Sequence, residues 1–95
     1  MPPRSESTSR CRAWVYILRC ADGSLYTGWT VDVDRRLAAH ASGRGSRYTR
    51  SRLPVELLAS IAMPDTSSAR REEARIKRLP RSAKLALLRQ HFAAS

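Results

Sequence analysis

The sequence predicts a small α/β domain of the α+β type, in which a three-stranded antiparallel sheet is flanked by helices in the order ββαβαα. Three observations support this fold class. Two strand-like runs are joined by a short turn that contains glycine, a third such run follows later, and helical periodicity marks the segments between and after them. With 95 residues the chain has room for one domain, which buries about 60% of the surface that its unfolded chain exposes.

The first two strands are expected to form a hairpin. Residues 14–18 and 25–30 are rich in β-branched and aromatic side chains, and the turn signal Ala21-Asp22-Gly23-Ser24 lies between them. The turn allows two registers. It is either a two-residue turn at Asp22 and Gly23, or a three-residue loop in which Gly23 adopts the left-handed conformation.

The register decides where the tyrosines point, because side chains alternate between the faces of a strand. The two-residue turn would place Tyr16 and Tyr26 on opposite faces. The three-residue loop makes Leu18 oppose Tyr26 and Tyr16 oppose Gly28, so both tyrosines converge beside a glycine that leaves an opening for a ligand phosphate. We expect this register because it also gathers an apolar surface on the other face, made of Val15, Ile17, Leu25 and Trp29. The alternative is that the tyrosines only pack as good β-formers.

A helix is expected after the hairpin, capped by Asp32 and ending near His40. Its apolar residues recur at a spacing of four, at Val33, Leu37 and Ala41. Residues 41–54 are rich in Ser, Gly and Arg and indicate a surface loop. Residues 55–63 then provide the third strand.

Two further helices complete the predicted fold. The second begins at Thr66 or Ser67 and ends near Leu79, and Pro80 separates it from a short third helix over residues 83–88. In this interpretation residues 1–11 form a flexible basic arm, residues 12–90 the single domain and residues 91–95 a C-terminal tail.

Composition points to a polyanionic partner. Eighteen Lys and Arg against eight Asp and Glu give a net charge of +10, so nucleic acid is the first candidate, although a basic protein can simply be soluble. The start lacks the apolar stretch of a secretory signal, and no run approaches the roughly 18 apolar residues that span a bilayer. We therefore expect a cytoplasmic protein without a membrane partner. Two widely spaced cysteines, Cys11 and Cys20, do not fit a zinc site or a disulfide framework and are expected to be reduced.

Arg36 and His40 are four residues apart on the first helix and therefore share one face, roughly opposite Leu37. The forked donors of an arginine match phosphate oxygens, and a histidine can relay a proton near neutral pH. The same spacing is also common on solvated helix faces, so the pair alone does not define a site.

Together these residues resemble the motif series of the GIY-YIG nuclease family. The first triplet is Val15-Tyr16-Ile17, the second, Tyr26-Thr27-Gly28, follows ten residues on, and the helical Arg36 and His40 come next. The resemblance covers about residues 13–80 and is closest to the short stand-alone bacterial members. It implies a three-stranded antiparallel sheet flanked by helices. It also implies hydrolysis of nucleic-acid phosphodiesters by an endonuclease of DNA repair or processing, with one Mg²⁺ or Mn²⁺, DNA favoured over RNA, and no small-molecule cofactor.

The resemblance assigns roles to positions of this chain. Tyr16 becomes the general base or the group that positions water, His40 the acceptor of its proton, Arg36 the stabiliser of the phosphate oxygens, and Tyr26 a further hydrogen-bonding group. The metal ligand falls on the second helix, where the small-residue spacing of the family indicates Glu73. Periodicity leaves Glu72 open, because both glutamates flank the stripe of Ala69, Ile76 and Leu79.

Departures from the family pattern keep alternatives open. Thr27 stands where the family usually has Ile, and the chain contains no asparagine, whereas some catalytic members have one downstream of the glutamate. A nucleic-acid-binding module without catalysis and a protein-interaction domain are therefore the competing functions.

The loop at residues 43–52 is a candidate nucleic-acid contact. Cations interleaved with one aromatic ring suit backbone phosphates and a stacked base; they are Arg44, Arg47, Tyr48, Arg50 and Arg52. The alternative is a solvated basic connection. Basic residues of the second helix either extend this surface or form an ordinary solvated face; they are Arg70, Arg71, Arg75, Lys77 and Arg78.

Overall fold

The computed structural model describes residues 12–94, with side chains described up to residue 90. Its elements are β1 (Ala13–Arg19), β2 (Leu25–Thr30), α2 (Val33–Ala41), α3 (Arg47–Arg50), β3 (Glu56–Met63), α4 (Thr66–Lys77) and α5 (Arg81–Ala94). The predicted α+β class and element order are confirmed, with the short helix α3 added inside the expected loop. The proposed N-terminal arm, which includes Cys11, lies outside the described residues.

The sheet has the strand order β2-β1-β3, and β1 pairs antiparallel with both neighbours. In the hairpin Leu18 opposes Tyr26 and Tyr16 opposes Gly28. Gly23 has a φ of 86°, a conformation that glycine adopts without strain, and the amide of Cys20 donates to the carbonyl of Ser24 at 2.9 Å. The three-residue loop that the apolar pattern favoured is therefore confirmed.

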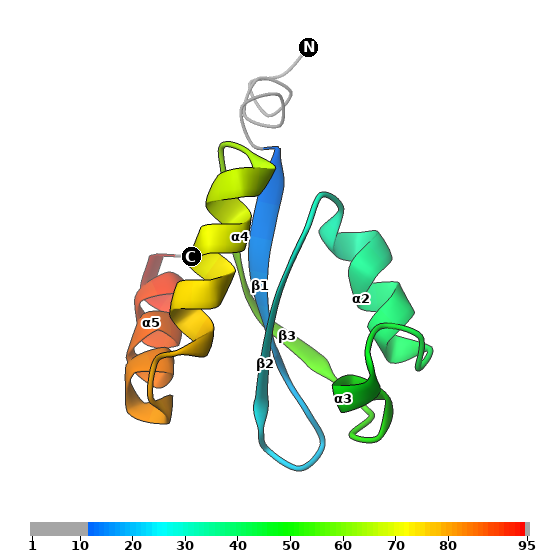
Figure 1. The fold of residues 1–95 in the computed structure, drawn as a ribbon. Helices are drawn as coiled ribbons and strands as arrows, with labels where there is room; N and C mark the ends of the chain where they lie inside the picture. The colour runs from blue at the N-terminus through cyan, green and yellow to red at the C-terminus, as the bar shows by residue number, and fades with distance from the viewer. Residues whose placement is uncertain (1–11, 95) are drawn as a thin grey trace.

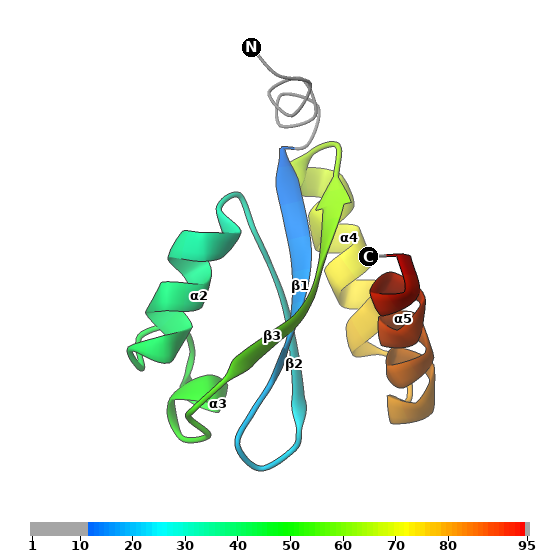
Figure 2. The ribbon, with the colours of Figure 1, turned by 180° about the vertical axis from the view of Figure 1, so that it is seen from behind.

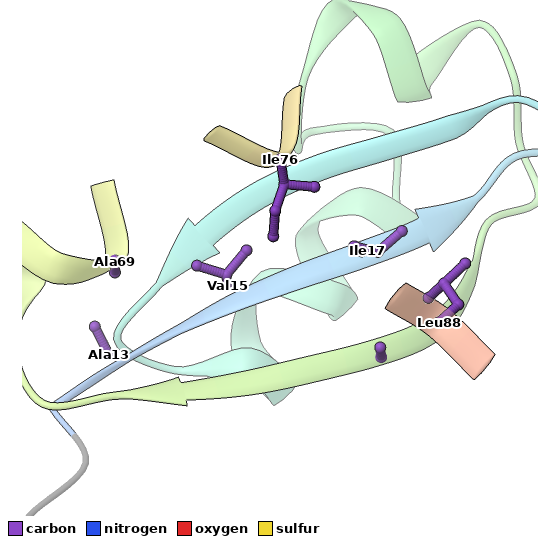
Figure 3. Close-up of a cluster of buried hydrophobic side chains, with 7 residues drawn as sticks. Ala13, Val15, Ile17, Ala69, Ile76 and Leu88 are labelled. Atoms are coloured by element: carbon purple, nitrogen blue, oxygen red, sulfur yellow. The ribbon is translucent and has the colours of Figure 1, made fainter. Parts of the chain in front are cut away.

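Helices cover both sides of this sheet. Helices α4 and α5 lie on one side, and α2 and α3 lie on the other (Figures 1 and 2). The apolar core lies on the α4 and α5 side, where Val15 and Ile17 of the central strand meet Ile76 and Leu88 (Figure 3). Two residues of the apolar face expected from the hairpin, Leu25 and Trp29, pack against this core while partly exposed.

Helix α4 begins at Thr66, one of the two expected starts, and ends at Lys77, slightly before the expected Leu79. Asp65 caps it, and its carboxylate accepts from the amide of Ser68 at 2.7 Å. Pro80 does more than separate the helices. Its carbonyl accepts the first hydrogen bonds of α5, which the amides of Ala83 and Lys84 donate. Helix α5 then continues to Ala94, so it is longer than residues 83–88 and includes most of the expected tail. In the described part of the chain, no helix has the length and apolar character needed to cross a membrane.

Candidate active site

Helix α2 carries two of the candidate site residues toward the sheet. Its N-terminus is capped by Asp32, whose carboxylate accepts from the amide of Arg35 at 3.1 Å. His40 is fully buried, whereas Leu37 is only partly buried. The expectation that Leu37 leads the buried side of this helix, with the polar pair opposite, is therefore wrong. The imidazole can be buried because both of its nitrogens have hydrogen-bond partners.

The two tyrosines of the hairpin meet this helix. The hydroxyl of Tyr16 lies 2.9 Å from Nε2 of His40, and Nε of Arg36 donates to the same hydroxyl at 3.4 Å. The ring centroid of Tyr26 lies 6.4 Å from that of Tyr16 and 5.2 Å from that of His40. The structure thus brings together four of the predicted residues on one face of the sheet: Tyr16, Tyr26, Arg36 and His40.

Gly28 has a different use from the one expected. A Cβ at this position would overlap the hydroxyl end of Tyr16. The space beside the glycine is therefore filled by the phenol of Tyr16 and does not admit a ligand. Only a residue without a side chain lets this phenol lie across β2.

The segment after α2 folds back beneath His40. Gly43 has a φ of 87°, and the amides of Gly43 and Arg44 donate to the carbonyls of His40 and Ala39 at 3.0 and 2.8 Å. These two bonds form a Schellman motif, which ends the helix and reverses the chain. The next glycine, Gly45, packs so closely on the imidazole of His40 that a Cβ there would overlap the ring.

Sequence reasoning missed Thr49, which completes the surroundings of His40. Its side chain is fully buried, and Oγ1 lies 2.8 Å from Nδ1 of His40. Ser46 caps α3 by accepting from the amide of Thr49 at 3.1 Å. The Ser-x-x-Thr spacing at a helix start was the available signal. Gly45 was missed as well, and its carbonyl accepts from Nη2 of Arg36 at 2.7 Å.

Two of the predicted nucleic-acid contacts hold the loop in place. The ring of Tyr48 stacks on Tyr26 with a centroid distance of 5.9 Å, and the guanidinium carbon of Arg52 lies 3.8 Å from the centroid of Tyr48. Arg52 also pairs with Asp22 of the hairpin turn at 3.0 Å. The other three predicted cations are exposed: Arg44, Arg47 and Arg50.

Burial sets the proton affinities of the central pair. Desolvation, helped by the charge of Arg36, lowers the pKa of His40 below its ordinary 6.5. Desolvation is also the main cause that raises the pKa of Tyr16 above 10.0, although the hydrogen bond from Arg36 opposes it. Near neutral pH both groups are therefore uncharged, and Arg36 is the cation that faces them.

The two candidate glutamates lie on α4, which packs on the other side of the sheet (Figure 1). The negative charge of Glu73 makes the smallest contribution to the raised pKa of Tyr16, so its carboxylate lies within electrostatic range of the phenol. Its Oε2 is 3.6 Å from Nζ of Lys77. Glu72 is held more tightly, since Nε and Nη2 of Arg75 donate to its two oxygens at 2.9 and 2.6 Å and lower its pKa. Glu73 is thus the less occupied carboxylate.

Glu73 borders a hollow of about 510 Å³ between α4 and the edge strand β2. The other residues that line it are Trp29, Ser67, Arg70, Arg71 and Ala74. Two guanidinium groups beside one carboxylate make this hollow suitable for an anion that also contacts a cation held by Glu73.

The donor set around Glu73 is sparse. Within residues 12–90, whose side chains are described, no three His, Cys, Asp or Glu residues gather as a metal cluster. A single carboxylate fits a hard divalent cation only if water and substrate oxygens complete its coordination, as Mg²⁺ commonly requires. The residues therefore fit one metal ion bound together with a substrate.

Comparisons with known proteins show the family and the fold of this chain. Residues 12–86 match the model of the GIY-YIG catalytic domain. The chain is similar to a UPF0213 protein of Streptococcus agalactiae, with 52% identity over 79 residues that cover 83% of this chain and 90% of that protein. The solution structure of the UPF0213 protein BH0048 from Bacillus halodurans is 50% identical, with a TM-score of 0.55, and the match covers 82% of this chain and 83% of that one. The protein EF2693 from E. faecalis is 37% identical, with a TM-score of 0.57 and 86% of each chain covered.

Proposed function

Because this chain belongs to the GIY-YIG family, a nuclease family, we propose that it is an endonuclease that hydrolyses nucleic-acid phosphodiesters. We further propose DNA as its substrate, in repair or processing, and one Mg²⁺ or Mn²⁺ as its metal ion. The observation that carries this proposal is the hydrogen-bonded group of Tyr16, His40 and Arg36, with Glu73 in electrostatic reach of the same phenol.

The proposed reaction is attack of water on phosphorus. A bond forms between the water oxygen and phosphorus, and the ester bond from phosphorus to the leaving oxygen breaks. Tyr16 gives its proton to His40 and takes one from the attacking water. The leaving oxygen takes its proton from a solvent water, and the proton on His40 returns through Tyr16 to the hydroxide that remains. The products are a phosphomonoester and an alcohol, and both side chains end as they began.

Positive charge is needed where negative charge develops. Arg36 donates to the hydroxyl of Tyr16 and to the carbonyl of Gly45, so its guanidinium is held beside the phenol that the proposed reaction uses. Donors that are preorganised in this way contribute about 3 to 4 kcal/mol in comparable sites. Tyr26, which lies beside Tyr16 and His40, would complete the hydrogen bonds around the phosphate or the water.

Glu73 would hold the metal ion, whose chemistry when bound is that of a Lewis acid for a phosphate oxygen. The bidentate pair between Glu72 and Arg75 supports Glu73 as the ligand. Arg70 and Arg71 would hold phosphates that flank the cleaved one on the α4 side of β2.

The exposed arginines of the α3 region, Arg44, Arg47 and Arg50, would contact phosphates on the other side. Tyr48 and Arg52, proposed with them as nucleic-acid contacts, would act by holding this loop against the hairpin, because both already contact groups of the protein. The net charge of +10 supports a polyanionic substrate.

The experiment is a cleavage assay on supercoiled, branched and single-stranded DNA and on RNA, with Mg²⁺ or Mn²⁺. Arg36→Ala should lower the cleavage rate by about 10²- to 10³-fold, as loss of a preorganised electrostatic group does, and Glu73→Gln should abolish the metal-dependent rate. The matched controls are Arg35→Ala and Glu72→Gln, the neighbouring residues of like chemistry, which should cut as the unmodified protein does.

The competing function is a nucleic-acid-binding module without catalysis, which the lack of asparagine in the chain favours. It predicts binding whose log affinity falls linearly with log salt, and no cleavage with any metal ion. Cleavage that survives both Arg36→Ala and Glu73→Gln would place the activity in another site or in a contaminant.

A further inference from the structure

A chain of hydrogen bonds extends from Tyr16 into the α3 segment, and its first two bonds are buried. It runs from the hydroxyl of Tyr16 to Nε2 of His40 at 2.9 Å, and from Nδ1 of His40 to Oγ1 of Thr49 at 2.8 Å. Oγ1 of Thr49 then lies 3.0 Å from Oγ of Ser46 and 3.4 Å from the carbonyl of Ser46. His40 and Thr49 are fully buried, so the two bonds to the imidazole are shielded from solvent, whereas the bonds between Thr49 and Ser46 are partly buried.

Donors and acceptors along this chain can be counted. Of the protein atoms that bond the Tyr16 hydroxyl, Nε of Arg36 can only donate, whereas Nε2 of His40 can accept. The phenolic proton therefore points to Nε2. In a neutral imidazole the other nitrogen then carries the proton, so Nδ1 donates to Thr49. Thr49 can accept it because its own hydroxyl proton has an acceptor in Ser46.

We propose that Thr49 is a positioning residue that holds His40 in the tautomer with its proton on Nδ1, leaving Nε2 free to take the proton of Tyr16. This inference rests on the proposed function for its catalytic meaning. Thr49 touches neither the substrate nor the reacting atoms in this account, and it acts only through His40.

The fold places Thr49 for this task by successive local interactions. The Schellman motif at Gly43 reverses the chain under His40, and Gly45 lets the backbone lie flat against the imidazole. Ser46 then starts α3, whose single turn brings Thr49 to the far side of the ring. The bond from Arg36 to the carbonyl of Gly45 ties this loop to the catalytic arginine.

The tautomer matters for the proton transfer. When Nε2 takes the phenolic proton, both ring nitrogens carry a proton, and Thr49 accepts from Nδ1 before and after the transfer. No proton moves onto Thr49. Without the hydroxyl of Thr49, the proton on Nδ1 would be buried and unpaired. This favours the other tautomer, in which Nε2 already carries a proton and cannot accept one from Tyr16.

The test reads the tautomer directly by long-range ¹H–¹⁵N NMR of the imidazole at about pH 8, where an ordinary histidine is neutral. The chain has two histidines, so a His91→Gln background leaves only the signals of His40. We expect a protonated Nδ1 in this background and in Thr49→Ser, and a shift toward protonated Nε2 in Thr49→Val. The cleavage rate of Thr49→Val should fall about tenfold, and Thr49→Ser should restore it.

Thr27→Val is the matched control. Thr27 is also buried, but it lies opposite Ile17 on the other face of the sheet, and its Oγ1 has no hydrogen-bond partner among the described residues. This variant should leave the tautomer and the rate unchanged. A proton on Nε2 in the His91→Gln background, or an unchanged tautomer in Thr49→Val, would overturn the inference. The NMR result does not depend on cleavage. Failure of the proposed function can therefore be distinguished from failure of the inference about Thr49.

Discussion

The central strand β1 has two buried faces of opposite chemistry. Val15 and Ile17 point into an apolar core that Ile76 and Leu88 complete. Tyr16 lies between them in sequence, is only 3% exposed, and points the other way, into hydrogen bonds. Val15 and Tyr16 thus reach similar burial in different ways, Val15 by close apolar packing and Tyr16 by paired polar groups.

The difference explains why the polar face is suited to chemistry. Apolar packing tolerates exchange of one side chain for another of similar volume. A buried polar group instead needs a partner with the right geometry, because an unmade hydrogen bond costs about 1 to 3 kcal/mol. The contacts around His40 and Arg36 therefore tolerate fewer side chains and geometries than those around Ile76. This restriction fixes the positions of the candidate catalytic atoms.

The largest expected effect on stability is on the apolar face. Ile76→Ala should lower the free energy of unfolding by about 2 to 5 kcal/mol, because it removes fully buried carbon and leaves a cavity. Denaturant unfolding followed by circular dichroism measures this. The control is Leu85→Ala on α5, where the side chain is 36% exposed and the loss should be much smaller. Equal losses in the two variants would contradict the assignment of the core.

A smaller effect is expected where the chain touches the imidazole. Gly45→Ala introduces a Cβ into the space of a buried ring, which should cost about 1 to 3 kcal/mol and displace His40. Its cleavage rate should fall even under conditions where the variant remains folded. Ser42→Ala, on the exposed side of the same turn, should stay within about 0.5 kcal/mol of the parent. A Gly45→Ala protein that keeps both stability and rate would mean that the contact is loose.

The smallest effect is a dependence of stability on pH. The pKa of His40 is lowered in the folded protein, so between its folded pKa and 6.5 the unfolded chain binds more protons. The contribution of neutral His40 is full above pH 6.5, falls as the pH drops through this window, and is lost below the folded pKa. The groups that face the ring are Tyr16, Tyr26, Arg36 and the uncharged Thr49.

Thermal unfolding at several pH values, compared with His40→Gln, isolates this contribution from carboxylates such as Asp65, whose pKa is also lowered. The difference in stability between the two proteins should shrink as the pH falls below 6.5. A constant difference across that range would show that His40 is not buried in its neutral form. The acidic limb of the cleavage rate should centre on the folded pKa of His40, at the lower edge of this window, since only neutral His40 can accept a proton.

Local patterns predicted the hairpin register, because Gly23 and the alternation of Val15 and Ile17 act within a few residues. They could not predict the buried side of α2. In the sequence, Arg36 and His40 resemble an ordinary solvated pair. Their partners lie elsewhere in the chain: Tyr16 is on β1, and Thr49 is on the short helix α3 inside a polar loop.

The choice of Glu73 as metal ligand stays a prediction. Periodicity of α4 left both glutamates possible and the family spacing favoured Glu73, and the ion pair of Glu72 with Arg75 within the same helix supports that choice. The family resemblance identified the residues that gather around Tyr16, whereas the loop residues Gly45 and Thr49 required the structure.

The most direct test of the central claim, that the polar face of β1 is a hydrolytic site, is the rate of metal-dependent cleavage by Tyr16→Phe. This change removes one oxygen and keeps the ring that packs against Tyr26. We expect a rate about 10²- to 10⁴-fold lower in a folded protein, with Tyr48→Phe cutting normally. Cleavage by Tyr16→Phe at the rate of the unmodified protein would contradict the claim.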